Sequence, residues 1–117
     1  MSRNQPKAVL HGGGQRLPVR WANVEGTPPA TISRYRVEPG AAVTRHVHTG
    51  KTEYWLVVAG QGIARVGDDD IPVREGDIVM TVPQVPHELL NTGSEPLLFV
   101  NVVQPVGDEP ITTTELA

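Results

Sequence analysis

Two histidines stand two residues apart, and a glutamate and a third histidine follow at spacings that could bring four side chains together. Because side chains of a strand point alternately to its two faces, His46 and His48 would project from the same side and could share one ion. Glu53 begins the next strand-like run after a short loop with Gly50, and His87 begins a later run after a Pro-bounded turn. We therefore predict a metal site in which three imidazoles and one carboxylate converge.

The chemistry of this donor set narrows the choice of metal. Neutral imidazole nitrogens with one carboxylate oxygen suit Mn, Fe, Co, Ni, Cu or Zn, whereas Ca and Mg prefer oxygen ligands. A single histidine is more often an ordinary polar group than a ligand, so the prediction depends on three of the four histidines falling at such positions. The fourth, His11, lies among three glycines and is not expected to bind metal. We expect one divalent transition metal ion per chain.

Short strands separated by tight turns are the elements expected to position these ligands. The chain has 12 Gly and 11 Pro residues, which disfavour long helices, and no segment shows helical periodicity. The strand candidates are residues 31–37, 43–48, 53–59, 63–66, 71–73, 78–82, 87–91 and 97–103. Short, regularly spaced strands of this kind indicate an all-β sandwich or barrel.

Composition and charge exclude several classes of protein. The 117 residues suffice for one domain, and the net charge of −3, without a dense basic run, argues against binding to nucleic acid or to an anionic membrane surface. No segment approaches the ~20 apolar residues of a membrane span. The absence of cysteine removes disulfides, thiolate metal sites and cysteine nucleophiles. We expect a soluble, cytoplasmic protein with a small-molecule partner.

The ligand spacing resembles the first sequence motif of the cupin family. Gly40, His46, His48, Glu53 and Gly60 follow the pattern Gly-X5-His-X-His-X4-Glu-X6-Gly at every fixed position. The resemblance implies a double-stranded β-helix, or jelly-roll barrel, with a metal inside. It also implies that the protein is a dimer, since small cupins often are.

The second cupin motif is present with two replacements. Gly76, Pro86, His87 and Asn91 are in register with it, while Val82 replaces the usual Pro and Gln84 the usual Gly. The turn chemistry before His87 can therefore differ from that of the family. Because Thr92 and Gly93 follow Asn91, we assign Asn91 to turn formation rather than to the site.

Three parts of the chain differ in character. Residues 1–29 are irregular and are expected to form an extended arm with one or two short strands. Residues 30–106 should form the barrel, and residues 107–117 either an edge strand or a loose tail. Because the polar arm could add a strand to a partner's sheet edge, it offers one way to build the predicted homodimer.

Two further features bear on the pocket. Alternation places Trp55 on the same strand face as Glu53, so Trp55 lies either near the metal or in the ordinary core. Arg34 and Arg36 share one face of their strand and could bind a carboxylate if that face lines the barrel. A solvent-exposed outer face is the favoured alternative for the two arginines.

Two hypotheses for function remain open, because a fold of this kind hosts many chemistries. The first is a metal-dependent enzyme acting on a small oxygen-rich organic acid or sugar acid, by dioxygenase, decarboxylase, isomerase or lyase chemistry. The second is a non-catalytic module that binds or senses a small ligand. No sequence feature decides between them, and no catalytic residue is assigned beyond the metal ligands.

Overall fold

Eleven strands make up the regular structure of the described part of the chain. The computed structural model describes residues 8–10, 13–26, 28 and 30–116; His11 lies outside them. The strands are β1 (Ala8–Leu10), β2 (Gly14–Leu17), β3 (Thr31–Val37), β4 (Ala42–Thr49), β5 (Lys51–Ala59), β6 (Gln61–Val66), β7 (Asp69–Arg74), β8 (Ile78–Thr81), β9 (His87–Asn91), β10 (Leu97–Pro105) and β11 (Thr112–Glu115). No helix among the described residues is long and apolar enough to cross a membrane.

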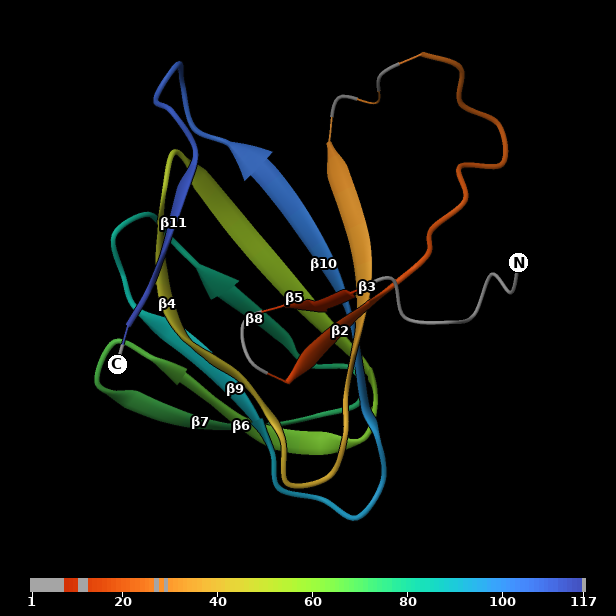
Figure 1. Cartoon of the computed structure of the whole chain (residues 1–117), viewed down its shortest axis with the longest axis vertical. Helices are drawn as coiled ribbons and strands as arrows, with labels where there is room; N and C mark the ends of the chain where they lie inside the picture. The colour runs from red at the N-terminus through yellow and green to blue at the C-terminus, as the bar shows by residue number, and fades with distance from the viewer. Residues whose placement is uncertain (1–7, 11–12, 27, 29, 117) are drawn as a thin grey trace.

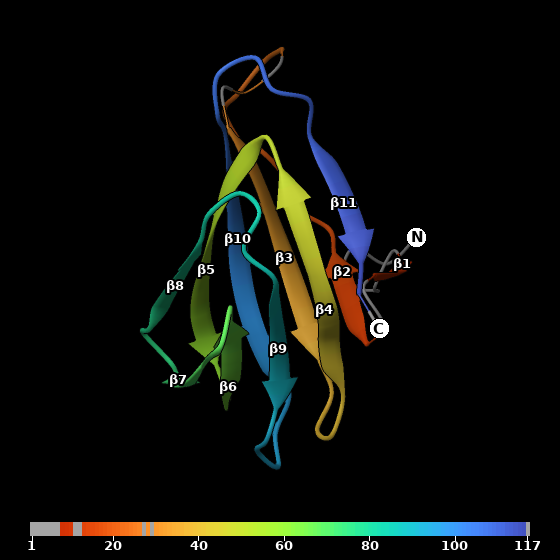
Figure 2. The same ribbon diagram turned by 90° about the vertical axis from the view of Figure 1, so that its left-hand side faces the viewer.

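The strands form two antiparallel sheets that face each other (Figures 1 and 2). One sheet has the order β1-β2-β3-β10-β5-β8 and the other the order β11-β4-β9-β6-β7. Strands distant in sequence lie side by side, so β10 pairs with both β3 and β5, and β9 pairs with both β4 and β6. This arrangement is a double-stranded β-helix, and the all-β prediction is confirmed.

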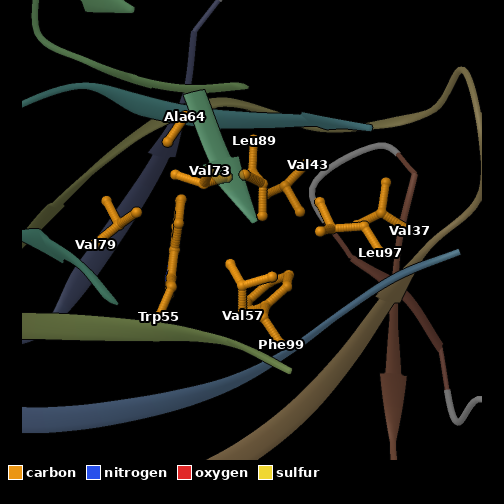
Figure 3. Packing of buried hydrophobic residues seen from close by; sticks show 10 residues of the cluster. All are labelled: Val37, Val43, Trp55, Val57, Ala64, Val73, Val79, Leu89, Leu97 and Phe99. Atoms are coloured by element: carbon orange, nitrogen blue, oxygen red, sulfur yellow. The ribbon is translucent and has the colours of Figure 1, made fainter. Parts of the chain in front are cut away.

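An apolar core fills part of the space between the sheets, and both sheets contribute to it (Figure 3). Val57 of β5 lies opposite Phe99 of β10 in one sheet, and Leu89 of β9 lies opposite Ala64 of β6 in the other. The buried members are Val37, Val43, Trp55, Val57, Ala64, Val73, Val79, Leu89, Leu97 and Phe99. These side chains hold the two sheets together and thereby fix the interior positions of both.

Two turns show where backbone conformation restricts the sequence. Gly60 has a φ of 85°, and a Cβ at this position would meet the Pro96 carbonyl oxygen at 2.6 Å, so no larger residue fits. Gln84, at the position of the usual family glycine, has a φ of 68°. This turn therefore keeps a left-handed conformation without glycine. The Gln84 N–H donates to the His48 carbonyl oxygen at 2.8 Å, which ties the turn to β4.

Strands near both ends of the chain extend the two sheets. β1 pairs with β2, and β2 pairs with β3, so the segment predicted as an arm lengthens the sheet of its own chain. β11 pairs with β4 and forms an edge of the second sheet, with Thr113 directly opposite His48. Both end segments thus lie next to strands that carry interior polar residues.

Candidate metal centre

β4 and β9 bring the three predicted histidine ligands together. His46 lies directly opposite His87 in the register of the two strands, and His48 follows on the same face of β4. A β-bulge between Val43 and His46 allows these two residues, three apart, both to face the interior. The ligand nitrogens of the three histidines lie within 4.8 Å of one another, and the residues are 1%, 3% and 1% exposed in chain order.

Hydrogen bonds at Nδ1 orient the three imidazole rings. Nδ1 of His46 lies 2.7 Å from the Thr44 carbonyl oxygen, and Nδ1 of His87 lies 2.9 Å from the Val85 carbonyl oxygen. A carbonyl oxygen only accepts, so Nδ1 donates in both rings and the Nε2 of each neutral ring keeps its lone pair. Nδ1 of His48 lies 2.8 Å from the Thr113 hydroxyl, which can accept in the same way.

Glu53 lies beside the histidines and also contacts two neighbours on β5. Its Oε1 is 3.4 Å from His48 Nε2, and its Oε2 is 3.9 Å from His87 Nε2. The same Oε1 accepts a hydrogen bond from Lys51 Nζ at 2.9 Å, and Oε2 accepts one from the Trp55 indole N–H at 3.3 Å. Glu53 is thus adjacent to the histidine cluster, and its place as a fourth ligand stays a prediction.

The charge states of these groups suit metal binding. Burial by itself would raise the pKa of the Glu53 carboxyl, but the hydrogen bond and charge of Lys51, helped by His48 and His87, lower this pKa below its usual value. Burial lowers the pKa of His48 from 6.5 to about 4, and the nearby Glu53 only partly opposes this shift. At neutral pH the site therefore offers a carboxylate and a neutral His48 imidazole.

A cavity of about 180 Å³ opens beside the histidines. Its lining combines charged, hydroxyl, amide and apolar groups: Arg16, Thr31, Ser33, Tyr35, Val43, His46, His48, Lys51, Glu53, Trp55, Phe99, Asn101 and Val103. Trp55 belongs to the core and also borders the histidine cluster, because its ring lies 5.5 Å from the core ring of Phe99 and 5.3 Å from the His87 ring, centroid to centroid.

The two arginines of β3 lie away from the cavity. Ser33 and Tyr35 line it, so the alternation of the strand places Arg34 and Arg36 on the outer face. Arg34 donates to a backbone carbonyl of the preceding loop at 3.1 Å, and Arg36 forms an ion pair with Glu38 at 2.6 Å. The hypothesis that either arginine binds a carboxylate in the pocket is wrong, and the favoured outer-face alternative is correct.

Several polar cavity residues were not identified in the sequence analysis, among them Arg16 of β2, Lys51 of β5 and Asn101 of β10. Alternation from Phe99 would have placed Asn101 inside the barrel, and alternation from Glu53 would have placed Lys51 there. No sequence signal identifies Arg16, because its position depends on how β2 folds back onto β3.

Asn91 has the structural role assigned to it. Its Nδ2 donates to the carbonyl oxygens of Val37 and Glu95 at 2.9 and 2.8 Å, and its Oδ1 accepts from the Gly93 N–H at 2.9 Å. These three hydrogen bonds satisfy the buried Asn91 amide. They also stabilise the turn between β9 and β10.

Comparison with known proteins places this chain in one family. The family model of the cupin domain matches residues 33–103, which include all four predicted ligands. The chain therefore belongs to the cupin family, and the resemblance seen in the two motifs is confirmed.

Three similar proteins illustrate the match. The oxalate-binding protein of Thermotoga maritima is 31% identical over 72 residues, which are 62% of this chain and 60% of that protein. A crystal structure of a predicted oxalate decarboxylase from the same organism has a TM-score of 0.72 at 23% identity, covering 87% of this chain and 91% of that one. A Klebsiella pneumoniae protein with a double-stranded β-helix domain has a TM-score of 0.66 at 28% identity, with coverages of 84% and 91%. The match thus spans about three fifths of the first relative, and the likeness to the decarboxylase shows the fold alone.

Proposed function

We propose that His46, His48 and His87 bind one divalent transition metal ion and that Glu53 is the fourth ligand. The observation that carries this proposal is the buried trio of imidazoles with ligand nitrogens within 4.8 Å of one another. Backbone carbonyls hold two of the three rings in the tautomer that ligation by Nε2 requires. Mn, Fe, Co, Ni, Cu and Zn all suit such a donor set.

We infer that the cavity binds a small oxygen-rich organic acid or sugar acid. Arg16 and Lys51 supply positive charge, while Ser33, Tyr35 and Asn101 supply hydrogen-bonding groups to a space of about 180 Å³. An anionic molecule rich in oxygen complements this lining. The Thermotoga maritima relative is named for binding oxalate, a small dicarboxylate, which supports the same chemical class here.

The function we favour is metal-dependent catalysis on such an acid. When bound, the ion supplies Lewis-acid or redox chemistry, which dioxygenase, decarboxylase, isomerase and lyase reactions use. The residues of the chain hold the site in position: Lys51 keeps Glu53 ionised, and the Trp55 indole N–H fixes the second carboxylate oxygen. Phe99 and Val103 add apolar surface to the cavity and exclude water from part of it.

A second candidate is a module that binds or senses a small acid without turnover. The name of the oxalate-binding relative favours this alternative, because it specifies binding and no reaction. The same cavity and the same histidines would serve both functions, so only a measurement of product separates them.

A substrate screen decides between the two candidates. Protein reconstituted with Mn, Fe, Ni or Zn is incubated with small keto acids, dicarboxylates and uronates, and oxygen uptake and products are measured. Conversion faster than with the free metal supports the enzyme. If these acids perturb the absorption spectrum of the cobalt-substituted protein but none of them is converted, the protein is a binding module and not an enzyme.

The assignment of Glu53 has its own test. Glu53→Gln removes the charge of the proposed fourth ligand while three imidazoles still hold the ion, so we expect metal affinity to fall without being lost. Glu88→Gln is the matched control, because Glu88 lies next to His87 and contacts Arg65 at 3.5 Å. Equal metal affinity of Glu53→Gln and wild type would remove Glu53 from the ligand set.

We further propose that the protein is a homodimer. β1 and β2 pair within their own chain, so the contact we favour is the outer face of β5 and β8 rather than arm exchange. Leu56 lies opposite Ile78 on this face, and Leu56, Ile78 and Met80 are 37%, 65% and 55% exposed. Light scattering should give twice the chain mass of 12.6 kDa, and Met80→Lys should shift it toward the monomer. A wild-type monomer at micromolar concentration would contradict the proposal.

A further inference from the structure

A buried polar side chain of the cavity has an atom that no described residue satisfies. Asn101 is 7% exposed and lies on the inward face of β10, between Ser33 of β3 and Trp55 of β5 in the register of the sheet. Its Oδ1 accepts no hydrogen bond from the described part of the chain. Because an unsatisfied buried oxygen is unfavourable, this position favours a cavity ligand that brings a hydrogen-bond donor.

Arg16, an exposed residue of β2, brings a positive charge to the rim of the same wall. β2 places Arg16 directly opposite Tyr35 of β3, and both residues line the cavity. Burial raises the pKa of the Tyr35 hydroxyl and the charge of Arg16 opposes this rise, as expected for neighbouring groups. The other cavity cation, Lys51, is engaged by Glu53 at 2.9 Å, whereas the ion pairs among the described residues do not include Arg16. The charge of Arg16 is therefore available to an anion.

We propose that Arg16 and Asn101 form a binding subsite that makes the cavity selective for hydroxy acids. The Arg16 guanidinium binds a carboxylate of the ligand, and a ligand hydroxyl donates to Asn101 Oδ1. A buried acceptor discriminates against analogues that lack the donor, so plain acids and keto acids bind less tightly. This inference rests on the proposed function and deepens it, since it states which oxygen-rich acids the cavity prefers.

The subsite and the three histidines lie on different sheets, and only Glu53 of the proposed ligands shares the sheet of the subsite. β2 and β10 belong to one sheet, and β4 and β9, which carry His46, His48 and His87, belong to the other. Substitutions at Arg16 and Asn101 should therefore change ligand preference and leave the metal content of the protein unchanged.

The test measures binding of tartronate and malonate to zinc-loaded protein by titration calorimetry. Tartronate differs from malonate by one hydroxyl, and we expect it to bind the wild type about tenfold more tightly than malonate. An α-hydroxyl can also contact the metal, so the decisive quantity is the tartronate-to-malonate affinity ratio. This ratio should fall about tenfold in Asn101→Leu and in Asn101→Ala, the second variant serving if the first does not fold. An unchanged ratio overturns the proposal.

The role of the Arg16 charge is tested against a control arginine, Arg20, on the same part of the chain. Arg16→Gln should weaken tartronate and malonate about equally, by roughly tenfold, while Arg20→Gln, an exposed residue that does not line the cavity, should have no effect. Equal effects of the two substitutions overturn the role of Arg16. If the protein takes up none of Mn, Fe, Ni and Zn, the metal-dependent function fails. The same ratios on metal-free protein then decide the subsite: a hydroxyl preference lost in Asn101→Leu supports it, and its absence contradicts it.

Discussion

The interior of the barrel is polar at one end and apolar at the other, although the same strands build both ends. Along β5 the inward residues pass from Glu53 to Val57, and along β9 they pass from His87 to Leu89. β10 passes in the same direction from Asn101 to Phe99, beside β5. Strand alternation places all of these side chains inside the barrel. The two ends therefore have the same strand backbone and differ only in side-chain chemistry.

The two ends of the barrel contribute differently to stability. Burial of apolar side chains such as Val57 and Leu97 stabilises the fold by about 25 cal/mol per Å² of surface removed from water. Buried polar groups such as His48 and Glu53 are unfavourable unless they are paired or bind a ligand. The apolar end therefore stabilises the barrel and holds the polar end in a conformation that it would not stabilise alone.

The largest expected effect comes from the apolar end. Leu97 is fully buried, so Leu97→Ala should lower the free energy of unfolding by about 2–5 kcal/mol in urea denaturation. The metal content of the folded fraction should stay unchanged, because no metal ligand is touched. Leu98→Ala, at the neighbouring half-buried position of β10, is the control and should have a smaller effect. Loss of metal from folded Leu97→Ala would show that the two ends are not separable.

At the polar end, the hydroxyl of Thr113 should position His48. Thr113→Val removes the partner of His48 Nδ1, so metal affinity should fall about tenfold in a competitive titration with a chelator, with little change in stability. Thr112→Val is the matched control, since the Thr112 hydroxyl contacts Thr49 at 2.6 Å and no histidine. If the two variants bound metal with similar affinity, the Thr113 hydroxyl of β11 would not position His48.

Acid should destabilise the metal-free protein through the polar end. The pKa of His48 is lowered from 6.5 to about 4, so between these values the unfolded chain binds a proton that the folded chain does not. The free energy of unfolding should therefore fall as pH decreases from about 6.5 to 4, and the lowered pKa of Glu53 extends the loss below pH 4.5. Urea denaturation of chelator-treated protein measures this slope. His48→Gln should flatten it, and a slope unaffected by this substitution would contradict the assignment.

The smallest expected effect concerns the turn that ties β4 to the segment before His87. Gln84 has a φ of 68°, which glycine adopts without strain, so Gln84→Gly should stabilise the protein by about 0.5–1 kcal/mol. Gln61→Gly, at an exposed position of β6, should instead destabilise it by a similar amount, because glycine in a strand loses more conformational entropy. If Gln84→Gly also lowered the free energy of unfolding, the conformation of this turn would not be strained.

The sequence predicts the clustering of the three histidines, because residue type and spacing carry the information. Alternation in β4 places His46 and His48 on one face, and the fold then needs only to place β9 beside β4. The bulge that also turns Val43 inward could not be predicted, because it depends on the pairing of β4 with β9 and not on a local sequence signal.

The far wall of the cavity could be predicted less well. β3 has apolar residues on both faces, with half-buried Ile32 outside and buried Val37 inside, so the sequence alone does not say which face lines the barrel. The inward face carries Ser33 and Tyr35, and the arginines therefore point outward. The exposed Arg16 lines the cavity only because β2 pairs with β3, a contact between strands that are distant in sequence.

The most direct test of the account is the metal content of the protein. Elemental analysis is performed on wild type, His48→Ala and His11→Ala, purified without chelator and exposed in turn to Mn, Fe, Ni and Zn. We expect close to one equivalent per chain in wild type and in His11→Ala, and loss of most of it in His48→Ala, because one of the clustered ligands is gone. A wild-type protein that retains none of these metals, or a His48→Ala variant that retains as much as wild type, would contradict the central claim.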